Sequence, residues 1–238
     1  MSTISRPALS KDDRLELRTG DKMTREEFHR VYEMMPEHVK AELIGGIVYV
    51  ASPLSRGHGT NHLPLGSLFF AYEGATSGVE SGDNTTVLLG DESEPQPDLY
   101  LRILPEWGGQ SRTSNDDYVD GAPELVAEIA HGSRSIDLHA KRDDYTRYGV
   151  QEYLVLSLRE RQLRHFDLRA RQELPPEADG IVRLRTFPGL WVDAEALLAK
   201  DHARLLMATL QRGLATPEHA VFVERLAAAR GGGGAVKP

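Results

Sequence analysis

The chain has no cysteine, which excludes disulfide bonds and metal sites built on thiolates. It also lacks any apolar run near the roughly 20 residues that are needed to cross a bilayer. Residues 1–7 carry no apolar signal core. These absences lead us to expect a protein of the reducing cytoplasm without a membrane segment.

A zinc-binding arrangement is also missing, although the chain has nine histidines. His58 and His62 are four residues apart and would share one face of a helix. The residues between them include no glutamate, which metalloproteases with this histidine spacing require. We therefore do not expect a zinc site.

An overall excess of basic residues is absent, because the net charge is −8. Proteins that bind nucleic acid are usually basic, since neutralising phosphates supplies much of their affinity. Residues 134–171 nevertheless contain nine Lys/Arg and six Asp/Glu, a local balance of 9 − 6 = +3. Residues 91–94 are acidic. Solvated surface explains both regions equally well, so charge alone does not identify a partner.

The composition, with 40% hydrophobic and 27% charged residues among 238, indicates one ordinary globular domain with extensions. Apolar periodicity and turn residues predict both helices and strands, and therefore a mixed α/β fold. Helices are expected at 24–35, 58–72, 137–149, 194–212 and 217–229, a hairpin at 39–51, and strands at 85–89, 97–104, 125–130, 153–158, 163–168 and 181–192, the last with a turn at 188–189. Thr24 and Glu27 should form a capping box at the start of the first helix, and Gly149 should end the third. Residues 106–121 are expected to form a polar loop. We divide the chain into a flexible arm (1–20), a main domain (21–193), a C-terminal helical extension (194–230) and a flexible tail (231–238).

The residues that indicate chemistry are carboxylates in apolar strands. Asp98 follows a proline at the start of one predicted strand, and Glu128 interrupts the apolar run 125–130. Burying an isolated carboxylate is costly, and a divalent cation is one means of compensating it. Lys141 begins the next helical segment, and Glu42 lies in the early hairpin. Two carboxylates with a nearby lysine are what metal-assisted phosphodiester cleavage requires.

Each of these residues also has a purely structural interpretation. Asp98 alone is well explained as an edge-strand residue that caps a turn, and Glu128 as the solvent-facing residue of a half-exposed strand. Lys141 and Asp137 are four residues apart on one helix, so they could form a surface ion pair of about 0.3–0.5 kcal/mol. Glu42 fits an exposed hairpin position.

The order of these motifs resembles the bacterial family of "putative restriction endonucleases" in the PD-(D/E)xK nuclease superfamily. The similarity covers roughly residues 22–195, and no single motif carries it. The segments that match the family pattern are 41–46, 97–99, 121–128, 135–141 and 145–153.

The resemblance implies a restriction-endonuclease-like core, a mixed curved sheet flanked by helices. It implies that Asp98 and Glu128 bind Mg²⁺ or Mn²⁺ and that the backbone carbonyl of Ile129 completes the metal shell. It further implies a catalytic role for Lys141 and assistance from Glu42. The superfamily places its lysine two residues after the acid, where this chain has Ala130; in some branches the lysine has moved to the following helix.

Two histidines occupy positions next to the expected site. The resemblance places His58 at the start of the family's first long helix, and His131 directly after the acid strand. His131 could reach the metal or the phosphate, or merely end the strand. Tyr145 and Tyr148 follow the lysine at helical spacing, and we interpret both as core or groove-wall residues.

The expected function is a Mg²⁺-dependent endonuclease that acts on DNA and that works as a homodimer. The alternative is a catalytically weak or inactive member of the fold that serves as a binding or interaction module. Ala130 in the strand-lysine position and the acidic net charge keep this alternative open.

Overall fold

The computed structural model describes residues 16–36, 38–51, 53, 55–130, 136–175, 177–199 and 203–232, with the backbone alone at 136 and 137. Most of the expected arm and tail therefore lies outside the described residues. His131, one of the two expected site-adjacent histidines, lies outside them as well.

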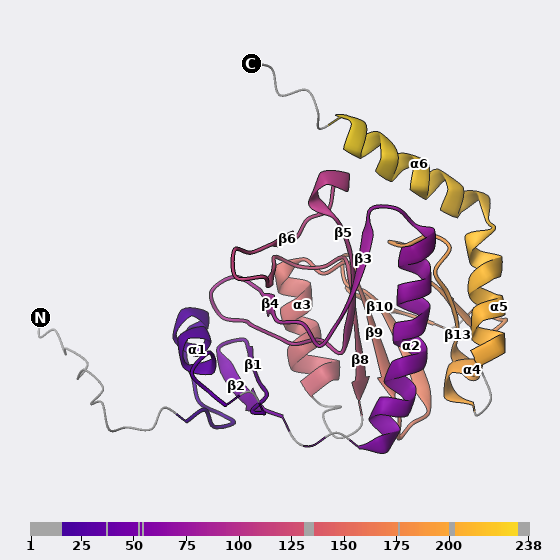
Figure 1. Ribbon diagram of the computed structural model, residues 1–238. Helices are drawn as coiled ribbons and strands as arrows, with labels where there is room; N and C mark the ends of the chain where they lie inside the picture. Colours follow the sequence, from indigo (N-terminus) through magenta and orange to yellow (C-terminus); the bar gives the residue numbers. More distant parts are fainter. Residues whose placement is uncertain are drawn as a thin grey trace, which may run out of the picture.

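A six-stranded mixed sheet forms the centre of the molecule (Figure 1). Its strand order is β11-β10-β9-β8-β5-β3, and only the middle pair, β8 and β9, is parallel. The mixed α/β sheet expected from the sequence is confirmed. The strands are β3 (Val79–Asp83), β5 (Leu99–Ile103), β8 (Leu125–Ala130), β9 (Glu152–Ser157), β10 (Gln162–Asp167) and β11 (Gln172–Leu174).

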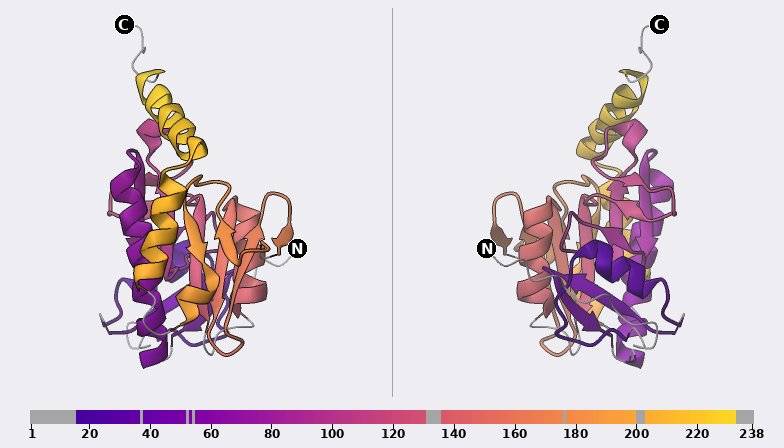
Figure 2. Two further views of the ribbon diagram at one scale, coloured as in Figure 1. Left: turned by 90° about the vertical axis from the view of Figure 1, so that its right-hand side faces the viewer. Right: turned by 90° about the vertical axis from the view of Figure 1, so that its left-hand side faces the viewer.

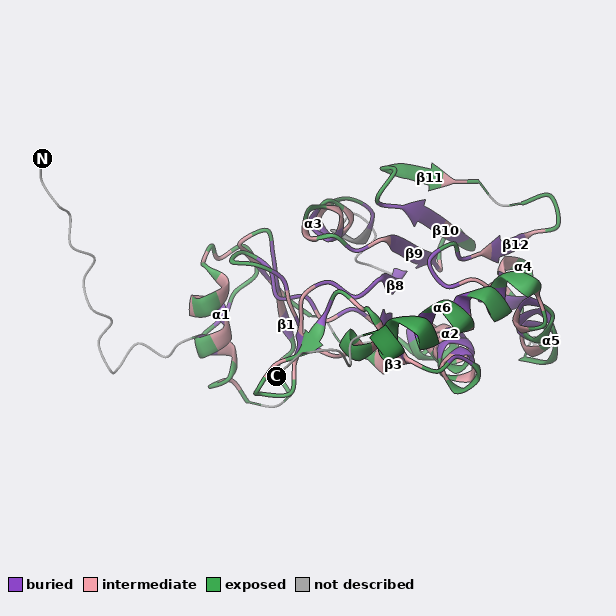
Figure 3. Cartoon of the chain, turned by 90° about the horizontal axis from the view of Figure 1, so that it is seen from above, coloured by how far each residue is buried: buried purple, intermediate pink, exposed green. Residues whose placement is uncertain are grey.

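Helices cover both faces of this sheet, which Figure 3 shows from above. The long helix α2 (Arg56–Ala75) packs on one face with the C-terminal helices, and α3 (Arg142–Tyr148) packs on the other. Strand β8 alternates between the two cores: Ala127 belongs to the α2 side, and Val126 to the α3 side. All six residues of β8 are buried, so Glu128 is not the solvent-facing residue of a half-exposed strand.

A wide π-helical turn, η2 (Ile136–Lys141), leads directly into α3. Such turns are uncommon and often occur at functional sites. Here the turn places Lys141 at the entrance to α3, beside the end of β8. The helix ends where Gly149 adopts a left-handed conformation with φ of 95°, which glycine enters without a steric penalty.

The N-terminal elements form a small unit with its own apolar cluster. This unit contains α1 (Arg25–Tyr32), β1 (Ala41–Ile44) and β2 (Ile47–Val50). The predicted capping box is confirmed, because Thr24 and Glu27 exchange hydrogen bonds at the start of α1. The hairpin of β1 and β2 carries Glu42, which contacts Lys141 at the entrance to α3.

The chain between β3 and β8 also contains short elements. A three-stranded sheet joins β4 (Val87–Leu88), β7 (Val119–Asp120) and β6 (Arg112–Thr113). The 3-10 helix η1 (Pro105–Trp107) follows β5. The polar segment expected to be a loop at 106–121 is therefore partly ordered as strands.

The C-terminal region differs from the prediction in two places. Residues 181–192 form two strands rather than one, β12 (Ile181–Arg183) and β13 (Trp191–Asp193), which pair antiparallel across the turn expected at 188–189. The chain reverses between them at Gly189, whose φ of 91° lies in the left-handed region. A single helix at 194–212 was wrong, because the backbone becomes extended at Ala199. The structure has α4 (Ala194–Leu198), α5 (Ala203–Leu214) and α6 (Pro217–Gly232) instead.

These C-terminal helices contribute to the main core. Leu206, Leu210 and Phe222 are buried in the same cluster as the α2 face of the sheet. Side views show α4 and α5 lying along the body of the molecule while α6 extends beyond it (Figure 2). None of the helices in the described part of the chain is long and apolar enough to cross a membrane.

Candidate active site

Asp98 lies immediately before β5, at the end of the sheet where β5 separates from β8. The last pair of their ladder is Leu99 with Ala127, so the next antiparallel position sets Asp98 beside Glu128. The Oδ2 atom of Asp98 accepts a hydrogen bond from the backbone N–H of Ile129 at 2.7 Å. The carboxylate is thus fixed against the backbone of the strand that carries Glu128.

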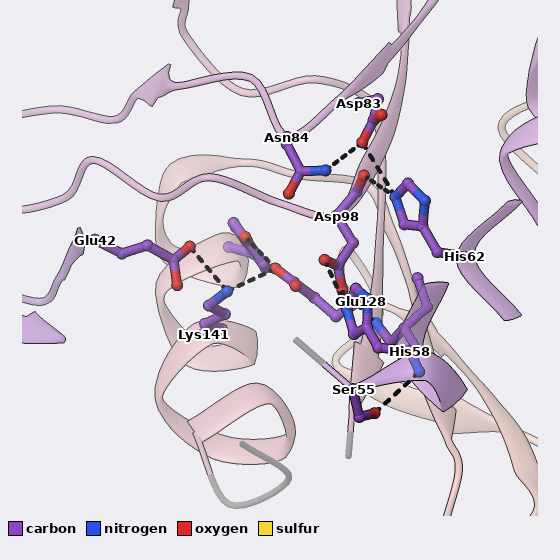
Figure 4. A network of polar contacts seen from close by, with 11 residues as sticks. Glu42, Ser55, His58, His62, Asp83, Asn84, Asp98, Glu128 and Lys141 are labelled. Carbon is purple, nitrogen blue, oxygen red and sulfur yellow. Dashed lines mark hydrogen bonds and ion pairs between the residues drawn. The ribbon is translucent and has the colours of Figure 1, made fainter. Parts of the chain in front are cut away.

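Two histidines of the first turns of α2 hold Asp98 from the other side (Figure 4). The Nε2 atom of His58 lies 3.1 Å from Oδ1 of Asp98, and Nε2 of His62 lies 2.9 Å from its backbone oxygen. Burial opposes ionisation of Asp98, but His58, the Ile129 N–H and the charge of Lys141 outweigh it and lower the pKa of the carboxyl. Asp98 is therefore held in its charged form.

Glu128 faces α3 and is almost completely buried. Its Oε1 atom accepts hydrogen bonds from Nζ of Lys141 and from the hydroxyl of Tyr145, both at 2.9 Å. A buried carboxylate requires such partners, because desolvation without compensation strongly disfavours the charge.

Lys141 connects Glu128 with the N-terminal hairpin. Its Nζ atom lies 2.9 Å from Oε1 of Glu42 and 2.9 Å from Oε1 of Glu128. The Oε1 atom of Glu42 also accepts a hydrogen bond from the backbone N–H of Gln96 at 2.7 Å. Lys141 is buried, so an exposed surface ion pair does not describe it. The side chain of Asp137, the other member of that suggested pair, lies outside the described residues.

Tyr145 is the contact that sequence reasoning missed. Its position, four residues after Lys141 on the same helix face, was the available signal. The side chain is fully buried, and burial together with the neighbouring Glu128 carboxylate raises the pKa of the phenol well above its ordinary value. The hydroxyl therefore remains protonated and acts as a donor to Glu128.

The sequence pattern of the Uma2 family, described as "Putative restriction endonuclease", matches residues 25–195. The chain belongs to this family. The matched range includes Glu42, Asp98, Glu128 and Lys141, and it ends just inside α4.

A solved structure shares the fold of this Uma2 chain. It is described as a putative nuclease from Anabaena variabilis, with a TM-score of 0.56 and 13% sequence identity. The match covers 79% of this chain and 99% of the other. At this level of identity, the likeness concerns the fold alone. No curated protein matches the chain.

Asp144 attaches the Glu42 hairpin of the Uma2 chain to α3. Its carboxylate accepts a hydrogen bond from the backbone N–H of Gly45 at 3.1 Å and another from the hydroxyl of Ser93. Burial raises the pKa of this carboxyl, although Ser93 and the Gly45 N–H partly offset the effect. One helix thus contacts Glu128 through Lys141 and Tyr145, and positions the Glu42 hairpin through Asp144.

The donor chemistry of this cluster fits Mg²⁺ or Mn²⁺. Asp98, Glu128 and Glu42 provide carboxylate oxygens, which these hard cations prefer. The N–H and C=O of one strand residue point to the same edge, so the Ile129 carbonyl faces Asp98 as its N–H does. The Lys141 ammonium already forms ion pairs with two of these carboxylates, so a positive charge lies between them in this structure.

The described residues do not form a ready-made metal cage. Among them, no three His, Asp or Glu side chains are arranged to hold a metal ion. Lys141 lies between Glu42 and Glu128, and His58 contacts Asp98 (Figure 4). Binding of a divalent cation by these carboxylates would therefore require side-chain rearrangement around Lys141 and Asp98.

Proposed function

We propose that this Uma2 chain is a Mg²⁺-dependent endonuclease that hydrolyses phosphodiester bonds in DNA. The observation that supports this proposal best is that Asp98 and Glu128 lie opposite each other, directly after the last pair of the β5–β8 ladder. Lys141 contacts Glu128 at the same place. The fold and the family agree with it, and the solved relative is described as a nuclease.

In this proposal, Asp98, Glu128 and the Ile129 carbonyl hold Mg²⁺ or Mn²⁺, and Glu42 assists. The metal, when bound, supplies Lewis acidity at the phosphate and lowers the pKa of water. The His58 contact and the Ile129 N–H keep Asp98 oriented and ionised. Lys141 leaves its carboxylate partners and directs its ammonium toward the attacking water or the phosphate, where it stabilises developing negative charge.

DNA is the proposed substrate, and a homodimer is the proposed working form because two sites cut both strands of a duplex in one binding event. The chain's net charge of −8 makes binding depend on local basic groups and on the metal. We further propose that the protein acts in the cytoplasm, in keeping with the absence of cysteine.

A cleavage screen tests the function directly. Supercoiled plasmid, linear duplex, single-stranded DNA, branched DNA and RNA are incubated with the protein in Mg²⁺, in Mn²⁺ and in a chelator. The proposal predicts metal-dependent internal cuts in DNA that Asp98→Asn abolishes. Cleavage that survives both the chelator and Asp98→Asn would assign the activity to a contaminant or another site.

The second candidate function is a binding module with the nuclease fold and little or no catalysis. The specific observation in its favour is that Lys141 already forms ion pairs with both Glu42 and Glu128. A closed set of ion pairs of this kind is also stable without a metal. Nucleic-acid binding without metal-dependent cleavage of any substrate in the screen would favour this alternative.

A further inference from the structure

We propose that Tyr145 is a positioning residue that orients the Glu128 carboxylate for the metal while Lys141 is redirected toward the substrate. This inference rests on the proposed function, and it concerns a residue whose role the fold and the family leave open. Of the two contacts to Glu128, the one from Tyr145 persists when the metal binds, and the one from Lys141 is given up.

The two donors meet on the same atom. The Tyr145 hydroxyl and the Lys141 ammonium each lie 2.9 Å from Oε1 of Glu128. They come from positions one helical turn apart, at the entrance to α3 and on its first full turn. Because both bind one oxygen, the Tyr145 hydroxyl still contacts the carboxylate when Lys141 is redirected.

The Tyr145 ring cannot easily move away. It is 1% exposed and packs edge-to-face against Tyr153, with 5.2 Å between ring centroids. Both rings belong to the apolar cluster between α3 and the sheet, together with Val126 and Ala130 of the Glu128 strand. Close-packed interiors hold such rings in one rotamer. The hydroxyl therefore stays at Glu128 when other side chains rearrange.

Lys141 differs from Tyr145 in being both mobile and charged. Its flexible four-carbon side chain spans Glu42 and Glu128, and its ammonium can re-form its contacts elsewhere. Its positive charge neutralises Glu128 and opposes a nearby divalent cation, whereas the neutral phenol leaves the full negative charge available. A neutral and immobile donor is therefore the contact that suits a carboxylate that binds a metal.

Tyr145→Phe tests the inference because it keeps the ring and removes the hydroxyl. Mn²⁺ binding to the full chain is measured by calorimetry, and thermal melts are recorded without metal. Loss of a hydrogen bond to a ligating carboxylate typically weakens metal affinity by about 10–100-fold, and we expect a change of that size. Cleavage by the variant should recover toward the parent rate as Mn²⁺ is raised to saturation.

Tyr72→Phe is the matched control. Tyr72 is also fully buried, and its hydroxyl donates one hydrogen bond, to the backbone oxygen of Pro188 at 2.8 Å. It packs on the α2 side of the sheet, away from Glu128. This variant loses one buried phenol contact without changing the carboxylate site, so its Mn²⁺ affinity should equal that of the parent.

The outcomes separate the inference from the function on which it rests. Weaker Mn²⁺ binding by Tyr145→Phe, with parental binding by Tyr72→Phe, supports the positioning role. Equal affinity of Tyr145→Phe and the parent overturns that role and leaves the metal site intact. An equal weakening in both variants also overturns it, because the effect is then general. A parent protein that binds no Mn²⁺ overturns the proposed function itself.

Discussion

Replacing Lys141 by alanine should destabilise the fold as well as slow cleavage. The side chains of Lys141 and Glu128 are only 6% and 5% exposed, and that of Glu42 is 19% exposed. Removing one member of a buried pair leaves a buried charge without compensation, which costs about 3–5 kcal/mol. Because water reaches Glu42 and Tyr145 still binds Glu128, we expect the lower end, about 3 kcal/mol.

For a chain of this size, each kcal/mol lowers the melting temperature by about 2–4 °C, so Lys141→Ala should melt about 6–12 °C below the parent. The cleavage rate should fall on the order of 10²–10³-fold, as expected for a lost charge stabiliser. Thermal melts in a chelator isolate the first effect. Single-turnover cleavage at a temperature where both proteins are folded isolates the second.

Arg147→Ala is the matched control on the same helix. Arg147 forms an ion pair with Glu92 at 2.6 Å, but both side chains are about half exposed, at 59% and 49%. Solvent screens such a pair, and we expect an unchanged melting temperature. Adding Glu128→Gln to Lys141→Ala should recover part of the lost stability, since a buried charge is removed. If Lys141→Ala melts like Arg147→Ala, the buried ion-pair cluster does not exist in solution.

Three further predictions concern the rest of the fold. Burial opposes ionisation of Glu152, but His165 and two backbone N–H groups outweigh it and lower the pKa of this carboxyl from the usual 4.5. Ionised Glu152 therefore stabilises the fold above pH 4.5, and this contribution is lost as the pH falls through the folded pKa. Glu152→Gln should lose about 1–3 kcal/mol at pH 7, and denaturant titrations at pH 7 and 3.5 should show this difference shrinking in acid. Leu206→Asp, at a buried position of α5, should lose at least about 3 kcal/mol, whereas Leu205→Asp, at a position 58% exposed, should melt like the parent. Asp144→Ala should remove the acceptor of the Ser93 hydroxyl and one of the two acceptors of the Gly45 N–H, at a cost of about 1–3 kcal/mol. Hydrogen exchange at the β1–β2 turn should accelerate, and unchanged protection there would exclude Asp144 as the hairpin's attachment.

Local signals predicted several elements well. The apolar run at 125–130 is bounded by a glycine and a proline upstream, and β8 has the predicted bounds. The capping box at Thr24 and the left-handed Gly149 also appear as expected, because caps and turns depend on neighbours within a few residues. The helix expected at 58–72 is longer in the structure, where α2 spans Arg56–Ala75 and continues through Pro64.

Other features depend on contacts that no local pattern contains. The turn at 188–189 was expected from its residues, but the antiparallel pairing of β12 with β13 across that turn was not. Motif order suggested that Asp98 and Glu128 cooperate, but only the strand order sets β5 beside β8. The role of Tyr145 could not be assigned from the sequence, because helical spacing shows which residues share a face and not what that face contacts.

Mn²⁺ binding to the parent protein and to its carboxylate variants tests the central claim most directly. Calorimetry should show one site per chain in the parent, and both Asp98→Ala and Glu128→Ala should abolish it. Asp91→Ala, which removes an exposed carboxylate, should bind as the parent does. Binding by Asp98→Ala and Glu128→Ala that equals the parent's would contradict the assignment of these two carboxylates as the metal site.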